Sequence, residues 1–243
     1  MQFDNVYEDP QRAESYSRLE FPGTYYLAFR DLPAIIGKHA NGARALDFGC
    51  GAGRSARFLK KLGFDTVGVD ISENMIGMAC ELDPIGDYRV IEDDGIGLKG
   101  IGPFALVFSA FTFDNIPTTE RKITLFRSLA GILNDGGIIV NLVSSPDIYT
   151  HDWASFTTSI FPENRTAKNG DIVRTLMKDV DDRRPVDDIL CDDSAYREIY
   201  RQAQLEVIEV YRPLAYDNEP FEWISETEVA PWVIYVLKKA CVS

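Results

Sequence analysis

The stretch Leu46 to Ser55, LDFGCGAGRS, lies where an apolar strand ends and a helix begins. Its three glycines, Gly49, Gly51 and Gly53, form a G-x-G-x-G turn. Without side chains, such a turn lets the backbone approach a ligand closely, and the N-terminus of the following helix points at that ligand. A nucleotide-like ligand is therefore expected beside this turn.

The spacing of the glycines narrows the kind of ligand. A dinucleotide fingerprint G-x-G-x-x-G would need a further glycine where Arg54 or Ala56 stands. The next strand, DTVGVD, ends in Asp70, and an acid at the tip of the second strand is where a ribose diol is usually held. These features together predict an adenosine ligand that lacks a pyrophosphate.

The pattern on both sides of the turn alternates between strands and helices. Such alternation predicts a doubly wound, mostly parallel sheet covered on both faces. Two further strands near the chain's end are expected to form an antiparallel pair at the sheet edge. The expected strands of this sheet are 44–49, 65–70, 88–93, 104–109, 138–143, 205–214 and 231–239, and the expected helices are those from 9, 24–38, 54–63, 72–80, 118–133 and 193–204. Two more strands are expected over 171–180 and 185–191, on either side of the sequence DDRR.

An acid before a G-x-G-x-G turn, with a second acid ending the next strand, resembles the class I S-adenosylmethionine-dependent methyltransferases of small-molecule type. The resemblance covers about residues 44–143, and it implies a seven-stranded Rossmann-like sheet with S-adenosyl-L-methionine as cofactor. On this basis the chain is expected to be one domain. Its expected parts are an N-terminal helical arm (1–40), a cofactor-binding core (44–143), an inserted lid (144–192) and a C-terminal helix with edge strands (193–243).

The resemblance also implies roles for single residues. Asp47 would support the glycine turn, and Asp70 would bind the ribose hydroxyls. Asp94 would accept a hydrogen bond from the adenine amino group, with Asp93 as the alternative if the register is shifted by one. The expected cofactor-binding residues are Asp47, Gly49, Gly51, Gly53, Asp70, Ile71, Asp93, Asp94 and Ser109.

The acceptor should lie near the carboxyl edge of the sheet, where doubly wound folds bind their ligands. Asp114 and Asn115 follow the fourth strand, although capping of the next helix is an alternative role. His151 and Trp153 lie in a long aromatic loop after the fifth strand, where a histidine could be a base or simply polar surface. The candidate bases are thus Asp114 and His151, and the candidate acceptor contacts are Tyr25, Asn115 and Trp153.

The composition excludes several partners. With 25 Lys and Arg against 38 Asp and Glu, the net charge of −13 would repel nucleic acid and anionic membranes. No apolar stretch approaches the roughly 20 residues that span a bilayer, and the first residues are acidic and polar, so a cytoplasmic location is expected. The four cysteines and two histidines are too scattered for a disulfide framework or a zinc site. The acid pairs 181–182, 187–188 and 192–193 are expected on the solvated surface.

A small-molecule methyltransferase is therefore the favoured function, with transfer to oxygen or nitrogen by in-line displacement. One alternative is a nicotinamide-dependent oxidoreductase, which shares the fold but is opposed by Arg54 and Ala56. Another is a protein that binds the cofactor without catalysing any transfer. The acceptor and the oligomeric state are left open.

Overall fold

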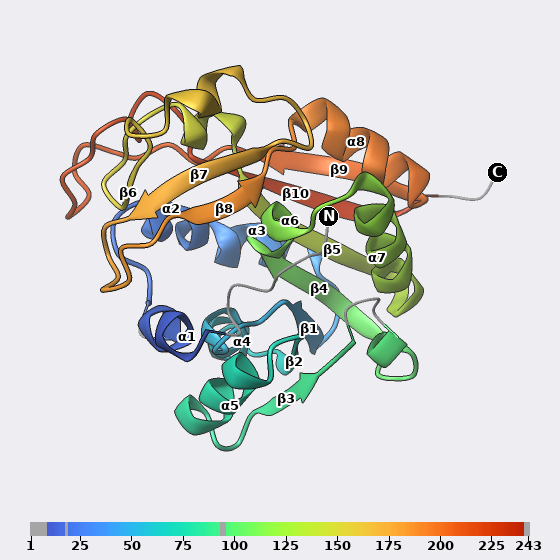
Figure 1. Cartoon of the computed structure of the whole chain (residues 1–243). Helices are drawn as coiled ribbons and strands as arrows, with labels where there is room; N and C mark the ends of the chain where they lie inside the picture. Colours follow the sequence, from blue (N-terminus) through green and yellow to red (C-terminus); the bar gives the residue numbers. More distant parts are fainter. Residues whose placement is uncertain (1–8, 18, 93–95, 241–243) are drawn as a thin grey trace.

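A computed structural model of the chain describes residues 9–17, 19–92 and 96–240. A seven-stranded sheet with the order β3-β2-β1-β4-β5-β10-β9 runs through it (Figure 1). Its strands are β1 (Arg44–Phe48), β2 (Asp65–Asp70), β3 (Asp87–Val90), β4 (Phe104–Ala110), β5 (Leu133–Ser144), β9 (Leu205–Tyr211) and β10 (Trp232–Lys239). The first five are parallel, while β10 is antiparallel to both β5 and β9. The predicted sheet and its antiparallel edge pair are confirmed.

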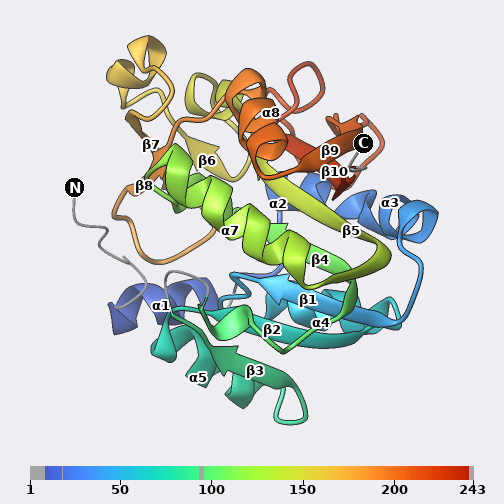
Figure 2. The same cartoon turned by 90° about the vertical axis from the view of Figure 1, so that its right-hand side faces the viewer.

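Helices cover both faces of the sheet (Figure 2). Alternate residues of β5 face opposite sides: Val140 joins the core formed with α2, α3 and α4, whereas Ile139 and Val143 join the core formed with α7 and α8. The helices are α1 (Pro10–Ser17), α2 (Thr24–Arg30), α3 (Leu32–His39), α4 (Arg54–Lys61), α5 (Glu73–Leu82), α6 (Thr112–Asn115), α7 (Thr119–Gly131) and α8 (Asp193–Gln202), with 3-10 turns η2 (Ile96–Leu98), η3 (Pro146–Tyr149) and η4 (Pro162–Thr166).

The helix ends follow local sequence, with one correction. The side chains of Ser72 and Thr118 cap α5 and α7. Each accepts a hydrogen bond from the backbone N–H three residues further along the chain, that of Met75 or Arg121. The single helix predicted over 24–38 is wrong, because the chain forms α2 and α3 with a break at Asp31. Pro33 explains the break, since it has no N–H to continue the hydrogen-bond ladder of the preceding turn.

The segment between β5 and α8 forms a small second sheet, which we call the lid. It contains β6 (Phe156–Thr157), β7 (Ile172–Met177) and β8 (Val186–Ile189) in antiparallel order. Figure 1 shows β7 and β8 passing beside α6, and α6 contacts β8. The strands predicted over 171–180 and 185–191 are therefore confirmed in shorter form, and the lid lies beside the carboxyl ends of the central strands.

Candidate functional site

A cavity of about 530 Å³ lies where the central strands end, and the arm and the lid bound its other sides. The turn after β1, the tip of β2 and the segment after β4 line it from the core. Ser17, Leu19 and Tyr25 line it from the arm, while Met177, Val186 and Asp188 are among its lid residues. The cavity therefore joins the glycine turn to the lid in one continuous space.

The glycine turn has three left-handed residues with different surroundings. Gly49, with φ of 71°, packs against Thr112, whose hydroxyl donates a hydrogen bond of 3.1 Å to the Phe48 carbonyl. Gly51, with φ of 51°, lines the cavity. Gly53 begins α4 and packs against the Tyr88 ring instead of lining the cavity. Two of the three predicted glycines thus reach the ligand space.

Asp70 is held at the tip of β2, where it lines the cavity beside Ile71. Its carboxylate accepts hydrogen bonds from the N–H groups of Gly51, at 2.8 Å, and of Ser72, at 2.9 Å. Burial raises the pKa of Asp70, and these N–H groups oppose that shift. The carboxylate therefore ties the tip of β2 to the glycine turn.

Asp47 and Ser109 are fully buried, and neither lines the cavity. The Ser55 hydroxyl donates a 2.6 Å hydrogen bond to Asp47, and burial raises the pKa of Asp47 to about 7. Asp47 Oδ1 and Ser109 Oγ are buried, without hydrogen-bond partners among the described residues. The predicted adenine contacts, Asp93 and Asp94, lie outside the described residues.

Two buried carboxylates, Asp114 on α6 and Asp188 on β8, line the same cavity, and we call them the carboxylate pair. Asp114 accepts hydrogen bonds from the Ser144 N–H at 3.0 Å and the Tyr196 hydroxyl at 3.4 Å. Asp188 accepts one from Asn115 Nδ2 at 2.6 Å and one from the Tyr149 hydroxyl at 3.1 Å. The lid thus contributes a charged group beside the predicted Asp114 and Asn115.

The pKa values of the carboxylate pair are raised. Burial raises the pKa of Asp114 to about 6. Burial and the charge of Asp114 raise the pKa of Asp188 to about 7. The prediction that acids 187–188 are solvated is wrong for Asp188, which is only 8% exposed. Alternation along β8 is the signal that could have found it, because Val186 and Asp188 share the inner face while Asp187 points outward.

The other predicted acceptor contacts separate into two groups. Tyr25 lines the cavity and stacks on Trp232, with 5.7 Å between ring centroids. His151 lies outside the cavity lining, where Nδ1 is 3.0 Å from the Asp147 carbonyl oxygen. Trp153 is fully buried and donates to the Ile148 carbonyl. Trp153 therefore packs in the core and His151 lies outside the cavity lining, so the contacts predicted for them are not made in the cavity.

Several cavity residues were missed by the sequence analysis. One wall of the cavity is aromatic and consists of Tyr25, Phe111, Phe156 and Trp232. The ring centroids of Phe111 and Trp232 are 4.8 Å apart. Arg54, the residue that breaks the dinucleotide fingerprint, also lines the cavity, and its guanidinium lies 5.0 Å from the Tyr25 ring. These residues come from distant parts of the chain, so no local pattern groups them.

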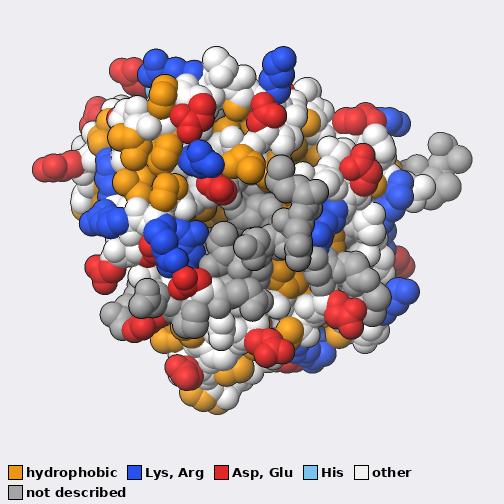
Figure 3. Space-filling model, in the orientation of Figure 1, with side chains coloured by type: hydrophobic (Ala, Val, Ile, Leu, Met, Phe, Trp, Pro, Cys, Tyr) orange, Lys and Arg blue, Asp and Glu red, His pale blue; other side chains and the backbone are white. Residues whose placement is uncertain are grey.

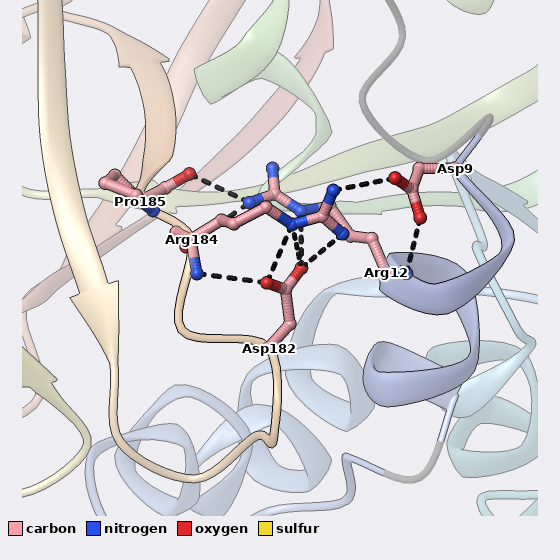
Figure 4. Close-up of polar contacts among 5 residues, drawn as sticks. All are labelled: Asp9, Arg12, Asp182, Arg184 and Pro185. Carbon is pink, nitrogen blue, oxygen red and sulfur yellow. Dashed lines mark hydrogen bonds and ion pairs between the residues drawn. The ribbon is translucent and has the colours of Figure 1, made fainter.

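The arm and the lid are joined by a polar contact that we call the latch (Figure 4). Arg12 of α1 donates to Asp182 at 2.9 Å and to the Pro185 carbonyl at 2.9 Å. Arg184 donates to Asp9 at 2.7 Å. Hydrogen bonds from Arg184 and Arg12 hold the pKa of Asp182 below its usual range. Ser17, which follows Arg12 in the arm, and Val186, which follows Pro185 in the lid, both line the cavity. The latch therefore joins the arm to the lid at one side of the cavity.

Two kinds of feature are absent from the part of the chain that the structure describes. No group of three or more His, Cys, Asp and Glu side chains is arranged to hold a metal ion. No described helix is long and apolar enough to cross a membrane.

A family model described as a methyltransferase domain matches residues 22–210, which is most of the chain. The chain belongs to the class I S-adenosylmethionine-dependent methyltransferase family. S-adenosylmethionine is the cofactor of this enzyme family. The match therefore confirms the predicted family and disfavours the nicotinamide-dependent alternative.

Curated relatives of the methyltransferase match about half of it. A ubiquinone biosynthesis O-methyltransferase of Burkholderia vietnamiensis is 27% identical over 143 residues, covering 53% of this chain and 60% of its own length. A 2-methyl-6-phytyl-1,4-hydroquinone methyltransferase of Synechocystis is 33% identical over 102 residues, covering 41% of this chain and 31% of its own length. The chain thus spans less than two thirds of the length of these relatives.

Solved structures share the fold over nearly the whole chain. The CcbJ methyltransferase of Streptomyces caelestis superposes with a TM-score of 0.69 at 17% identity, covering 98% of this chain and 100% of its own. DesVI of Streptomyces venezuelae gives 0.64 at 19% identity, covering 94% and 98%. At such identities the likeness shows the fold alone.

Proposed function

We propose that this methyltransferase transfers the methyl group of S-adenosylmethionine to a small organic acceptor held in the same cavity. The proposal rests mainly on one observation: the glycine turn, Asp70 and the carboxylate pair all line the same cavity. A cavity of about 530 Å³ is within the range of pockets that enclose small organic ligands.

The glycine turn and its neighbours fit the cofactor. A Cβ at Gly51 would meet only Met75 Cε among described atoms within 4 Å, so the missing side chain leaves room on the cavity wall. Asp70 would accept the ribose hydroxyls, with Ile71 packing beside them. Arg54 would pair with the cofactor's carboxylate, and Asp47 and Ser109 would support the turn from below. Asp94, or Asp93, remains our proposed adenine contact.

The cofactor supplies a methyl group already activated by a sulfonium charge. The chain's own contribution is to hold the acceptor in line with that group, and alignment can lower a barrier by about 7–11 kcal/mol. Tyr25, Phe111, Phe156 and Trp232 exclude water and offer ring faces that attract a positive charge by about 0.5–2 kcal/mol.

The carboxylate pair would remove a proton from the acceptor. A base works best when its pKa lies near the working pH. The raised pKa values of Asp114, about 6, and Asp188, about 7, meet that condition. We therefore assign the role of base to Asp114, as the sequence predicts, together with Asp188.

Charge favours a small molecule over a polyanion. The chain carries −13 net charge, and on the face in Figure 3 the Lys and Arg side chains lie among Asp and Glu. A phosphate backbone would be repelled by this balance. The names of the curated relatives, which refer to ubiquinone biosynthesis and to a hydroquinone, also point to small organic acceptors.

The proposal is tested by incubating the protein with S-adenosylmethionine and a panel of small amines, phenols and alcohols. Mass spectrometry should detect S-adenosylhomocysteine and an acceptor heavier by one methyl group, and Asp114→Asn should slow both together. Cofactor binding without turnover of any acceptor would support the non-catalytic alternative instead.

A further inference from the structure

We propose that the cavity is built for an acceptor with a basic nitrogen, an amine that enters as an ammonium ion and is held by Asp114 and Asp188. This inference rests on the proposed function and adds the chemical class of the acceptor. Asp114 and Asp188 are 4% and 8% exposed, and both line the cavity. They come from the core and from the lid, so an ion held by both would bridge these two parts.

The carboxylate pair lacks a charged partner. The four groups that donate to it, from Ser144, Tyr196, Asn115 and Tyr149, are all neutral. Among residues 9–17, 19–92 and 96–240, no Lys, Arg or His nitrogen forms an ion pair within 4 Å of either carboxylate, although other buried or partly buried acids such as Asp182 do have one. Buried carboxylates normally have a cation or a metal beside them. Among the described residues, the pair therefore has no cationic side chain within ion-pair distance, although Arg54 and Arg121 also line the cavity.

Lys122 is a cation whose charge acts on both carboxylates, but its ammonium donates its hydrogen bond elsewhere. Its Nζ donates to the Phe113 carbonyl and lies 5.2 Å from the centre of the Tyr196 ring. Burial lowers the pKa of Lys122, and the charges of Cys191, Asp114 and Asp188 oppose that shift only in part. Lys122 therefore acts on the pair from a distance and leaves the cavity side of the pair to a ligand.

An ammonium ion and a neutral alcohol would change the protonation of the pair differently. Near pH 6 to 7 the pair holds about one proton, because burial raises the pKa of Asp114 to about 6, and burial together with the charge of Asp114 raises the pKa of Asp188 to about 7. A bound ammonium favours the fully ionised pair and expels that proton, whereas an alcohol does not. The other described titratable groups that interact with the pair are Lys122 of α7, Tyr149 of η3, Tyr196 and Tyr200 of α8 and Cys191 after β8. Arg121 of α7 lines the same cavity.

The same pair would prepare the amine for reaction. An ammonium ion has no lone pair, so it must first pass a proton to a carboxylate of the pair. The nitrogen then forms a bond to the methyl carbon while the carbon–sulfur bond breaks and its electrons stay on sulfur. The positive charge moves from sulfur to the methylated nitrogen, which leaves as an ammonium ion.

The test is a ligand-observed NMR screen of the protein saturated with S-adenosylhomocysteine. The probes are matched triplets such as benzylamine, benzyl alcohol and benzoate, extended to other rings and short chains. We expect the amines to outnumber the alcohols and acids among the binders. Asp188→Asn and Asp114→Asn should each weaken amine binding at least tenfold. The control, Glu163→Gln, removes another lid charge that is 52% exposed, paired with Arg174 and outside the cavity lining, and should weaken it less than threefold.

Calorimetry separates this inference from the proposed function. If S-adenosylhomocysteine does not bind the wild type, the proposed function is contradicted. If it binds the wild type and both variants with the same affinity, the variants are folded, and the NMR screen then tests the class of the acceptor. Titrations in two buffers of different ionisation enthalpy at pH 6.5 should show proton release with amines. Binders dominated by alcohols or acids, amines that bind Asp188→Asn and Asp114→Asn as well as the wild type, or an empty screen would each overturn the inference.

Discussion

Gly49 and Gly51 both adopt left-handed conformations, but Gly49 packs against Thr112 whereas Gly51 lines the cavity. Substitution of each by alanine should therefore have different effects on stability and on ligand binding. Such a conformation costs a residue with a Cβ about 1–2 kcal/mol. Gly136→Ala, at φ of 77° with open space around it, is the control for this strain alone. Gly51→Ala should match the control in the free energy of unfolding by urea, but should weaken binding of S-adenosylhomocysteine.

Gly49→Ala should be the most destabilising of the three substitutions, because its Cβ would overlap Thr112. Overpacking of this kind adds about 1–3 kcal/mol to the backbone strain. Equal unfolding free energies for Gly49→Ala and Gly136→Ala would contradict the packing described for the turn.

Asp188 should also make stability depend on pH. Its pKa of about 7 is above that of an unfolded aspartate, so the folded chain holds a proton that the unfolded chain has released between pH 4 and 7. Stability therefore falls as pH rises through this window. The free energy of unfolding should decrease from pH 5 to pH 8 in both proteins, but less in Asp188→Asn than in the wild type. The two decreases should differ by at least about 1.4 kcal/mol, which is the equivalent of one pKa unit.

Urea unfolding at both pH values checks this, with Asp187→Asn as the control that should follow the wild type. A decrease of the same size in all three proteins would show that Asp188 is not the group responsible.

Asp70 and Asp188 show how far single residues could be predicted. Asp70 ends a clear strand and follows a glycine turn, so its place was readable from local pattern. Asp188 adjoins another acid, and the pattern of paired acids indicated a surface. Only the register of β8, which turns Asp188 inward beside Val186, reveals its place in the cavity.

At the scale of elements, the latch between α1 and the lid should control ligand exchange. Arg12→Met removes the hydrogen bonds to Asp182 and Pro185, and charged hydrogen bonds of this kind contribute about 1.5–3 kcal/mol. We expect S-adenosylhomocysteine to dissociate about tenfold faster. Stopped-flow fluorescence can follow this, because Trp232 lines the cavity.

Arg183→Met is the matched control, since Arg183 lies in the same turn but donates to the carbonyls of Met177 and Lys178. It should leave the dissociation rate nearly unchanged. If Arg12→Met and the control dissociate at the same rate as the wild type, the latch does not limit ligand exchange.

Helices and strands were predictable where the signal is local. Ser72 and Thr118 are such signals, because each stands at the start of an expected helix and its side chain caps that helix in the structure. The two-residue strand β6 is too short to show a period, and the break at Asp31 depends on a proline inside an otherwise continuous apolar pattern. The latch joins residues about 170 positions apart, and no local pattern predicts it.

At the scale of the whole molecule, the alternation of strands and helices predicts the doubly wound sheet because parallel strands need crossover connections. The two last strands were also expected as an antiparallel edge pair, and the structure places β10 between β5 and β9. The alternation of strands and helices does not predict how the arm and the lid contact each other at the edge of the sheet. This contact bounds the cavity and brings Tyr25 and Asp188 to it.

The central claim is that the glycine turn and Asp70 form the cofactor site, and calorimetric titration with S-adenosylhomocysteine tests it most directly. We predict one site per chain, with Asp70→Ala weakening the affinity at least about tenfold, since hydrogen bonds to a charged group contribute about 1.5–3 kcal/mol. Asp65→Ala, at the exposed start of the same strand, should bind like the wild type. No binding by the wild type, or equal affinity in Asp70→Ala, would contradict the account.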